Sequence, residues 1–143
     1  MTQDELVAAH RELARSGWEM QPDQGFIELV GPLWRFKSQD VERYCFWAAK
    51  QHRNRRGVVQ GGMLMTLADR ALGATARKND PAVSQATVQM SMSFLAPAQT
   101  NAVVEITCQI DRATRSLVFV SGQMCQGDRM IGTASGVWKI LGK

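Results

Sequence analysis

Apolar and polar residues alternate with a period of two over much of the second half of the chain. Residues 87–94 read TVQMSMSF, in which every second residue is apolar, and residues 104–111 show the same alternation. This pattern predicts antiparallel strands with one face toward a core. Two further strands are expected over residues 117–125 and 130–141, and the turn-like residues between them predict a hairpin.

The first half of the chain contains one strongly apolar helical segment. Residues 62–77 are apolar almost all round, and a helix of that kind is normally buried on most sides. A second helix is predicted over residues 2–16, because Thr2 and Glu5 have the spacing of a capping box. The other elements expected are strands over residues 26–37 and 42–48 and a loop over residues 51–59.

These elements predict an α+β protein in which a curved antiparallel sheet of five or six strands wraps around one long central helix. We expect a single domain over residues 1–143, with a core at residues 26–141 and an N-terminal helical extension at residues 1–17. A single curved sheet leaves unpaired edges, so we also expect a homo-oligomer.

The composition is ordinary for a globular protein, with 45% hydrophobic and 21% charged residues in 143. No apolar run reaches the roughly 18 residues of a membrane span. The polar, acidic start MTQDE does not resemble a signal peptide. The three cysteines lie far apart without a CxxC pair, which favours reduced thiols. We therefore expect a cytoplasmic protein that does not bind membranes.

The chain carries a modest excess of basic residues, which bears on the kind of ligand it could bind. The formal net charge is +4, and the densest basic cluster lies at residues 50–56. Such a cluster suits the phosphates of a small ligand, or it is simply a solvated surface. No nucleic-acid-binding motif is recognisable, so no nucleic acid partner is expected. The sequence also shows no metal-ligand cluster, no Ser-His-Asp set and no phosphate-binding glycine motif, so neither a metal nor a cofactor is expected.

Asp69 is the single acid within the central helical segment. The residues three and four positions away carry no positive charge, so no local ion pair explains the carboxylate. Aspartate is also a poor residue for the interior of a helix. Two interpretations follow. In the first, Asp69 is paired with a distant cation or lies at the surface. In the second, Asp69 is a functional base, and burial would raise its pKa.

Gly61 and Gly62 precede the apolar helix. The first N–H groups of a helix have no internal partner and lie at the positive end of its dipole, and a missing Cβ lets a ligand come close. The pair therefore forms a simple turn or a site that stabilises a polarised carbonyl. Asn54 and Gln60 flank this point and can donate amide hydrogen bonds, or they only shape the loop.

The segment HRNRRGVVQGG at residues 52–62, followed by LAD at residues 67–69, resembles the hot-dog-fold acyl-CoA thioesterases. It is most similar to the phenylacetate-pathway type of the 4-hydroxybenzoyl-CoA thioesterase superfamily, whose pattern is HxNxxGxxHGG with an acid nine residues after the second histidine. Asp69 lies nine residues after Gln60. The segment FLAPA that begins at Phe94 also matches this family, and the resemblance covers about residues 42–141.

The resemblance implies a hot-dog fold and hydrolysis of an acyl-CoA thioester at the interface of a homodimer or homotetramer. Asp69 would act as base or nucleophile, and Thr87 would help it hold the attacking water. Gly61 would donate its N–H to the thioester carbonyl, and Asn54 would bind that carbonyl or orient the water, both from the loop of the other subunit. The residues expected to contact the substrate are Gly62, His52, Arg53, Arg55, Arg56 and Arg115, with the arginines meeting the phosphates of coenzyme A.

One position departs from the family pattern, because Gln60 replaces the second histidine. Glutamine can position the loop and donate a hydrogen bond, but it cannot carry a proton or a positive charge. Gln60 stays among the expected catalytic residues, and two alternatives stay open: a non-catalytic acyl-CoA-binding protein, and a hydratase or dehydratase that uses His52. The sequence does not identify the acyl group of the substrate either, because the apolar residues on the helix and strands line either a tunnel for it or an ordinary core.

Overall fold

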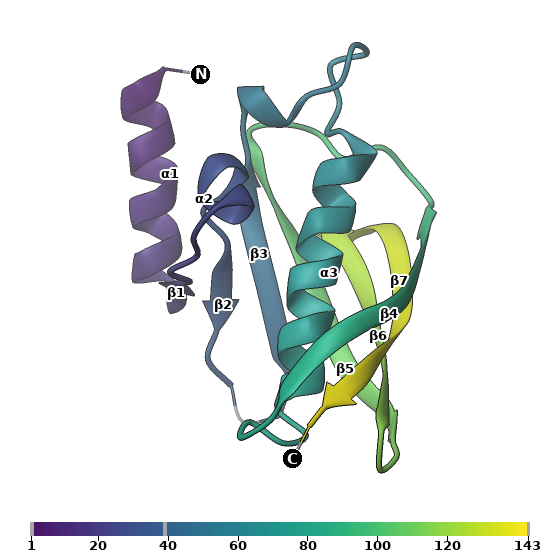
Figure 1. Cartoon of the computed structure of the whole chain (residues 1–143). Helices are drawn as coiled ribbons and strands as arrows, with labels where there is room; N and C mark the ends of the chain where they lie inside the picture. Colours follow the sequence, from purple (N-terminus) through teal and green to yellow (C-terminus); the bar gives the residue numbers. More distant parts are fainter. Residues whose placement is uncertain (1, 39, 143) are drawn as a thin grey trace.

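The computed structural model describes residues 2–38 and 40–142, in which a seven-stranded antiparallel sheet curves around one long helix (Figure 1). The strand order is β1-β2-β3-β5-β6-β7-β4. The strands are β1 (Trp18–Met20), β2 (Trp34–Phe36), β3 (Glu42–Ala48), β4 (Ser84–Phe94), β5 (Ala102–Ala113), β6 (Leu117–Gln126) and β7 (Arg129–Leu141). The helices are α1 (Gln3–Arg15), α2 (Phe26–Val30), the short 3-10 helix η1 (Lys50–His52) and the central α3 (Gly61–Arg77).

This architecture confirms the predicted α+β class and the wrapping of a curved antiparallel sheet around a central helix. The expected count of five or six strands is wrong, because the sheet has seven. The additional strand, β1, has three residues, which are too few to show a period in the sequence. The central helix begins at Gly61, one residue earlier than expected.

The strand expected over residues 26–37 is wrong in its first part, where the chain forms the helix α2. Ile27 and Val30 pack against the core, whereas Phe26 is 61% and Leu29 is 80% exposed. Inward residues three positions apart are typical of a helix. The run is too short for its sequence alone to distinguish that spacing from the period of a strand.

The core lies between α3 and the concave face of the sheet. Leu67 and Leu72 of α3 are fully buried in one apolar cluster with Phe46 of β3 and Ile106 of β5. Only eight of the 17 residues of α3 are buried, however, so the expectation of a helix covered on most sides is not met in the isolated chain. The uncovered side carries small and apolar residues together with the charged Asp69, Arg70 and Arg77.

Strand β4 forms one end of the sheet and pairs on one side only, with β7. A bulge between Thr87 and Gln89 interrupts the expected alternation, so Val88 is 59% exposed instead of sharing the inner face with Met90. The eleven residues of β4 include no charged residue and no proline. Charges and prolines usually prevent a free edge from pairing, so this edge is well suited to accept a further strand.

The N-terminal helix α1 begins as predicted, with a complete capping box between Thr2 and Glu5. Together with β1, β2 and β3 it forms a second apolar cluster, which contains Leu13, Trp18, Trp34 and Cys45. None of the helices in the described part of the chain is long and apolar enough to cross a membrane.

Candidate active site

The N-terminus of α3 is open to a ligand. Gln60 is the residue that precedes the first turn, and its side chain makes no capping hydrogen bond. The N–H groups of Gly61 and Gly62 have no partner within the helix, and the helix dipole favours negative charge at this end. The ring of Phe94 closes one side, because a Cβ added to Gly61 would lie only 3.3 Å from it. An oxygen that gains negative charge would be stabilised at these N–H groups.

The loop between η1 and α3 is held in shape by Asn54. The side-chain Oδ1 of Asn54 accepts hydrogen bonds from the backbone N–H groups of Arg56 (2.8 Å) and Val58 (3.3 Å). The backbone N–H of Asn54 donates to the Val58 carbonyl (2.7 Å). Gly57 completes the turn at φ +83°, which L side chains rarely adopt. Because the loop uses the side-chain oxygen of Asn54, the Nδ2 amide group is the part that can donate to a substrate.

His52 is buried and joins the loop to α2. Its Nδ1 accepts a hydrogen bond from the N–H of Ala49 at 2.9 Å, and its Nε2 donates to the carbonyl of Val30 at 2.6 Å. Desolvation by burial lowers the pKa of His52, although the hydrogen bond to Val30 opposes this effect. Both ring nitrogens therefore serve the backbone. They are not free for the substrate, nor for the proton transfer that a hydratase would need.

We expect the protein to lose stability as the pH falls below 6.5, partly because of His52. The pKa of His52 in the folded chain lies below the ordinary histidine value of about 6.5, so unfolding takes up a proton in the interval between these two pKa values. The slope for one such proton is at most about 1.4 kcal/mol per pH unit. Urea unfolding between pH 7.5 and pH 5.5 measures it, and His52→Asn should flatten the slope.

The pKa of His10 is also lowered, chiefly by desolvation, so His10→Asn should flatten the slope as well and measures the part of the slope that does not come from His52. An unchanged pH slope in His52→Asn would contradict the assignment of the neutral, backbone-bonded ring.

Asp69 and Thr87 meet on the uncovered side of α3. Thr87 Oγ1 donates a hydrogen bond to Asp69 Oδ1 at 3.0 Å, and both residues are exposed in the isolated chain. Among the described residues no cation forms an ion pair with Asp69. The structure thus brings two expected site residues together, and the second carboxylate oxygen, Oδ2, is left to accept a proton from a water molecule.

Within one chain, Asp69 is well separated from the helix N-terminus. Asp69 follows Gly61 by eight positions along one helix, which corresponds to about 12 Å at 1.5 Å per residue. One thioester carbonyl cannot contact both groups at that separation. The isolated chain therefore contains two halves of the expected site instead of a complete one.

Two of the clefts along α3 lie beside the two halves, and Gly61 itself lines a third, of about 570 Å³, together with Asn54 and Phe94. The first has a volume of about 990 Å³ and is lined by the loop and the first turns of α3, including Asn54, Gln60 and Gly62. The second has a volume of about 630 Å³ and is lined by the later turns of α3 and by β4, including Asp69 and Thr87. Each cleft is open, so a second chain can cover both.

The arginines expected to meet coenzyme A lie at two ends of the molecule. Arg55 and Arg56 are exposed on the loop before α3, where Arg53 also donates from Nε to the carbonyl of Lys50 at 3.2 Å. Arg115 lies in the turn between β5 and β6, at the opposite end (Figure 1). The structure does not bring Arg115 together with the other arginines in one chain.

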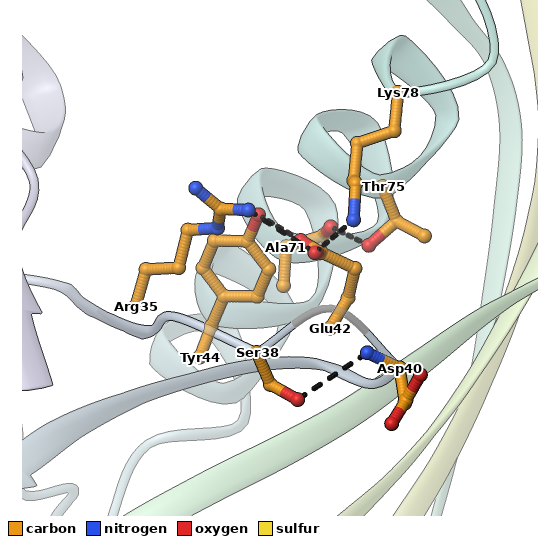
Figure 2. Close-up of polar contacts among 8 residues, drawn as sticks. All are labelled: Arg35, Ser38, Asp40, Glu42, Tyr44, Ala71, Thr75 and Lys78. Atoms are coloured by element: carbon orange, nitrogen blue, oxygen red, sulfur yellow. Dashed lines mark hydrogen bonds and ion pairs between the residues drawn. The ribbon is translucent and has the colours of Figure 1, made fainter. Parts of the chain in front are cut away.

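A cluster of charged residues around the buried Glu42 forms part of the wall of the second cleft, and sequence reasoning missed it. Figure 2 shows the carboxylate of Glu42 in contact with Arg35, Lys78 and the hydroxyl of Tyr44. Burial alone would raise the pKa of Glu42, but the hydrogen bonds from these three partners outweigh it and leave the pKa lowered. The one signal in the sequence is an acid, Glu42, that shares the inward face of its strand with Tyr44.

Comparison with known proteins assigns the family. The family model of the thioesterase superfamily matches residues 56–133, more than half of the chain. A candidate esterase of Pseudomonas aeruginosa is 31% identical over 118 residues, which cover 80% of this chain and 87% of the relative. The fold and these matches define a thioester hydrolase. The chain belongs to the thioesterase superfamily.

Solved structures share the fold. The PaaI protein of E. coli, from the phenylacetic acid degradation operon, has a TM-score of 0.75 at 13% identity, with 96% of this chain and 94% of that chain covered. A hypothetical thioesterase of Streptococcus pneumoniae, crystallised with coenzyme A, has a TM-score of 0.71 at 17% identity, with 87% and 98% covered. At these identities the likeness is one of fold, and it confirms the predicted hot-dog fold.

Proposed function

We propose that this protein hydrolyses acyl-CoA thioesters to a carboxylic acid and free coenzyme A, at sites that two chains share. The observation that carries this proposal is the hydrogen bond that Thr87 of β4 donates to Asp69 of α3. The same helix, α3, offers free N–H groups at Gly61 and Gly62. Family membership supports the reaction class. The exposed arginines of the loop offer positive charge for the phosphates of coenzyme A.

In the proposed reaction, Asp69 accepts a proton from a water molecule while the water oxygen attacks the thioester carbonyl carbon. The hydrogen bond from Thr87 fixes the carboxylate so that Oδ2 can take this proton. The carbonyl oxygen gains negative charge and is stabilised by the N–H of Gly61 and the Nδ2 group of Asn54, both from the other chain. The carbon–sulfur bond then breaks as the carbonyl re-forms, and the thiolate of coenzyme A takes up the proton held by Asp69, which restores the base.

The proposed pairing of two chains follows from the open edge of β4 and the uncovered side of α3. A two-fold axis beside β4 would extend the sheet with an antiparallel strand and place the two copies of α3 in opposite directions. The later turns of one α3 would then lie beside the loop and first turn of its partner. In this arrangement Asp69 of one chain approaches Gly61 of the other, and Arg115 moves toward the partner's loop.

Gln60 supports a second candidate function, an acyl-CoA-binding protein without hydrolysis. Its side chain is exposed and lines the first cleft, where it can donate a hydrogen bond but cannot supply a proton. The two candidates differ in one observable, the release of thiol.

Thiol release from a panel of aromatic and aliphatic acyl-CoA thioesters tests the proposal. We expect release from at least one thioester. Binding of acyl-CoA by the folded protein without any release would favour the second candidate and make Gln60→His the next variant to test.

A further inference from the structure

The cleft beside Asp69 has an unusually cationic wall. Its volume is about 630 Å³, and it lies between the later turns of α3 and the elements β2, β3 and β4. Four of its lining residues carry a positive charge: Arg35, Arg70, Arg77 and Lys78. In the proposed reaction the acyl group is attached to the carbonyl next to Asp69, so this cleft is where the acyl group would extend.

Ion pairing neutralises only part of this charge. Arg70 is paired with Asp23 at 3.1 Å. Arg35 and Lys78 share a single carboxylate, that of Glu42, so this cluster keeps a net charge of +1. Arg77, in the last turn of α3, is exposed.

Arg77 forms no ion pair within residues 2–38 and 40–142. Apart from Asp69, the wall therefore has a surplus of two positive charges, one from Arg77 and one from the cluster around Glu42. A wall of this kind favours an anion over a neutral group.

One buried donor in this wall also lacks an acceptor. The Nε of Arg35 is buried and makes no hydrogen bond with any described residue, whereas the guanidinium Nη2 is bound to Glu42 at 3.1 Å. A buried donor without a partner is costly, and a carboxylate oxygen is a strong acceptor for it. Two residues that line the same cleft also have a buried acceptor without a hydrogen bond among the described residues, Gln85 Oε1 and Asp23 Oδ2, and these acceptors suit a hydroxyl group or a water molecule instead.

The spacing of these groups sets the length of the ligand. Arg77 lies eight residues after Asp69, which is about 12 Å along the helix axis. Side chains on a helix tilt toward its N-terminus, so the guanidinium of Arg77 can cover part of this distance. An acyl chain of about six carbons would cover the rest.

We propose that this cleft selects acyl-CoA thioesters whose acyl group ends in a carboxylate, the half-thioesters of dicarboxylic acids, with Arg77 and Arg35 as the residues that bind this carboxylate. The inference rests on the proposed function. Glu42 acts as a positioning residue, because it holds the side chains of Arg35 and Lys78 at the wall.

Three CoA thioesters of equal chain length test the inference: adipoyl-CoA, 6-hydroxyhexanoyl-CoA and hexanoyl-CoA. Binding is measured by calorimetry with the Asp69→Asn protein, so that the preference is obtained even if no thioester is hydrolysed. Hydrolysis by the unmodified protein is measured separately as thiol release. We expect adipoyl-CoA to bind and react best, and Arg77→Gln to lower its preference over hexanoyl-CoA about tenfold.

The matched control is Arg11→Gln, which removes an exposed arginine of α1 far from the cleft and should leave the preference unchanged. Equal binding of all three thioesters, or tighter binding of the hydroxylated one, would overturn the inference while leaving the proposed hydrolysis intact. If Arg77→Gln weakened the binding of free coenzyme A as much as the binding of adipoyl-CoA, the arginine would bind a phosphate instead of the terminal carboxylate, and the inference would also fail. Preference for adipoyl-CoA in binding without any thiol release would uphold the inference and overturn hydrolysis.

Discussion

Asp69→Asn is expected to lower kcat for acyl-CoA hydrolysis by about a thousandfold, because general-base catalysis typically contributes 10²- to 10⁴-fold. The asparagine keeps the size of the side chain, and its carbonyl oxygen can still accept the hydrogen bond that Thr87 donates to Asp69. What it loses is the ability to accept a proton from water. Because Asp69 is exposed in the isolated chain, we expect an unchanged fold. Thiol release at saturating substrate measures the effect.

The chain offers a closely matched control for this substitution. Asp111 also accepts a hydrogen bond from a hydroxyl group, that of Ser121 at 3.0 Å, but it lies on β5 away from both clefts. Asp111→Asn therefore removes a similar exposed, hydroxyl-bonded carboxylate and should leave kcat unchanged. If Asp69→Asn kept more than a tenth of the normal kcat, Asp69 would not be the base.

Two inactive variants are expected to restore activity when they are combined in one dimer. Asp69→Asn removes the base, and Gly61→Val places a bulky side chain where the thioester carbonyl would approach the helix N-terminus. In a dimer with one copy of each variant, one site has both defects and the other has none. If each site takes its base from one chain and its N–H groups from the other, such a dimer should have about half of the normal activity.

Co-expression with two different affinity tags isolates the mixed dimer, and thiol release is compared with that of each variant alone. A Cβ at Gly61 would lie 3.3 Å from Phe94, so Gly61→Val also disturbs this ring. Gly62→Val serves as a second variant at the start of α3, because a Cβ at Gly62 has its nearest neighbour at 3.8 Å. No activity in either mixed dimer would contradict the proposed division of each site between two chains.

Much of the fold could be predicted because its signals are local. The strand over residues 42–48 has the predicted bounds, and the apolar run after Gly61 forms the central helix. The prediction of a strand at residues 26–30 was wrong because its local signal is too short. Five residues are too few to separate a helical period from that of a strand. The burial of α3 was overestimated for the isolated chain, and in the proposed dimer the partner chain would cover part of the exposed side.

The site was predictable where a spacing along one element fixes it. Gly61 and Asp69 lie on one helix, so their separation follows from the sequence alone. The cluster around Glu42 could not be predicted in this way. Its partners Arg35 and Lys78 come from β2 and from the end of α3, 7 and 36 positions away in the sequence, and only the folded chain brings them to one carboxylate.

The uncharged edge of β4 has a cost for a chain in which this edge is not covered. Eleven residues without a charge or a proline present unpaired backbone donors and acceptors together with the exposed side chain of Val88. An edge that readily accepts one correct strand also accepts incorrect ones, and this is how aggregates begin. Assembly would therefore protect the newly made protein from precipitation as well as complete its chemistry.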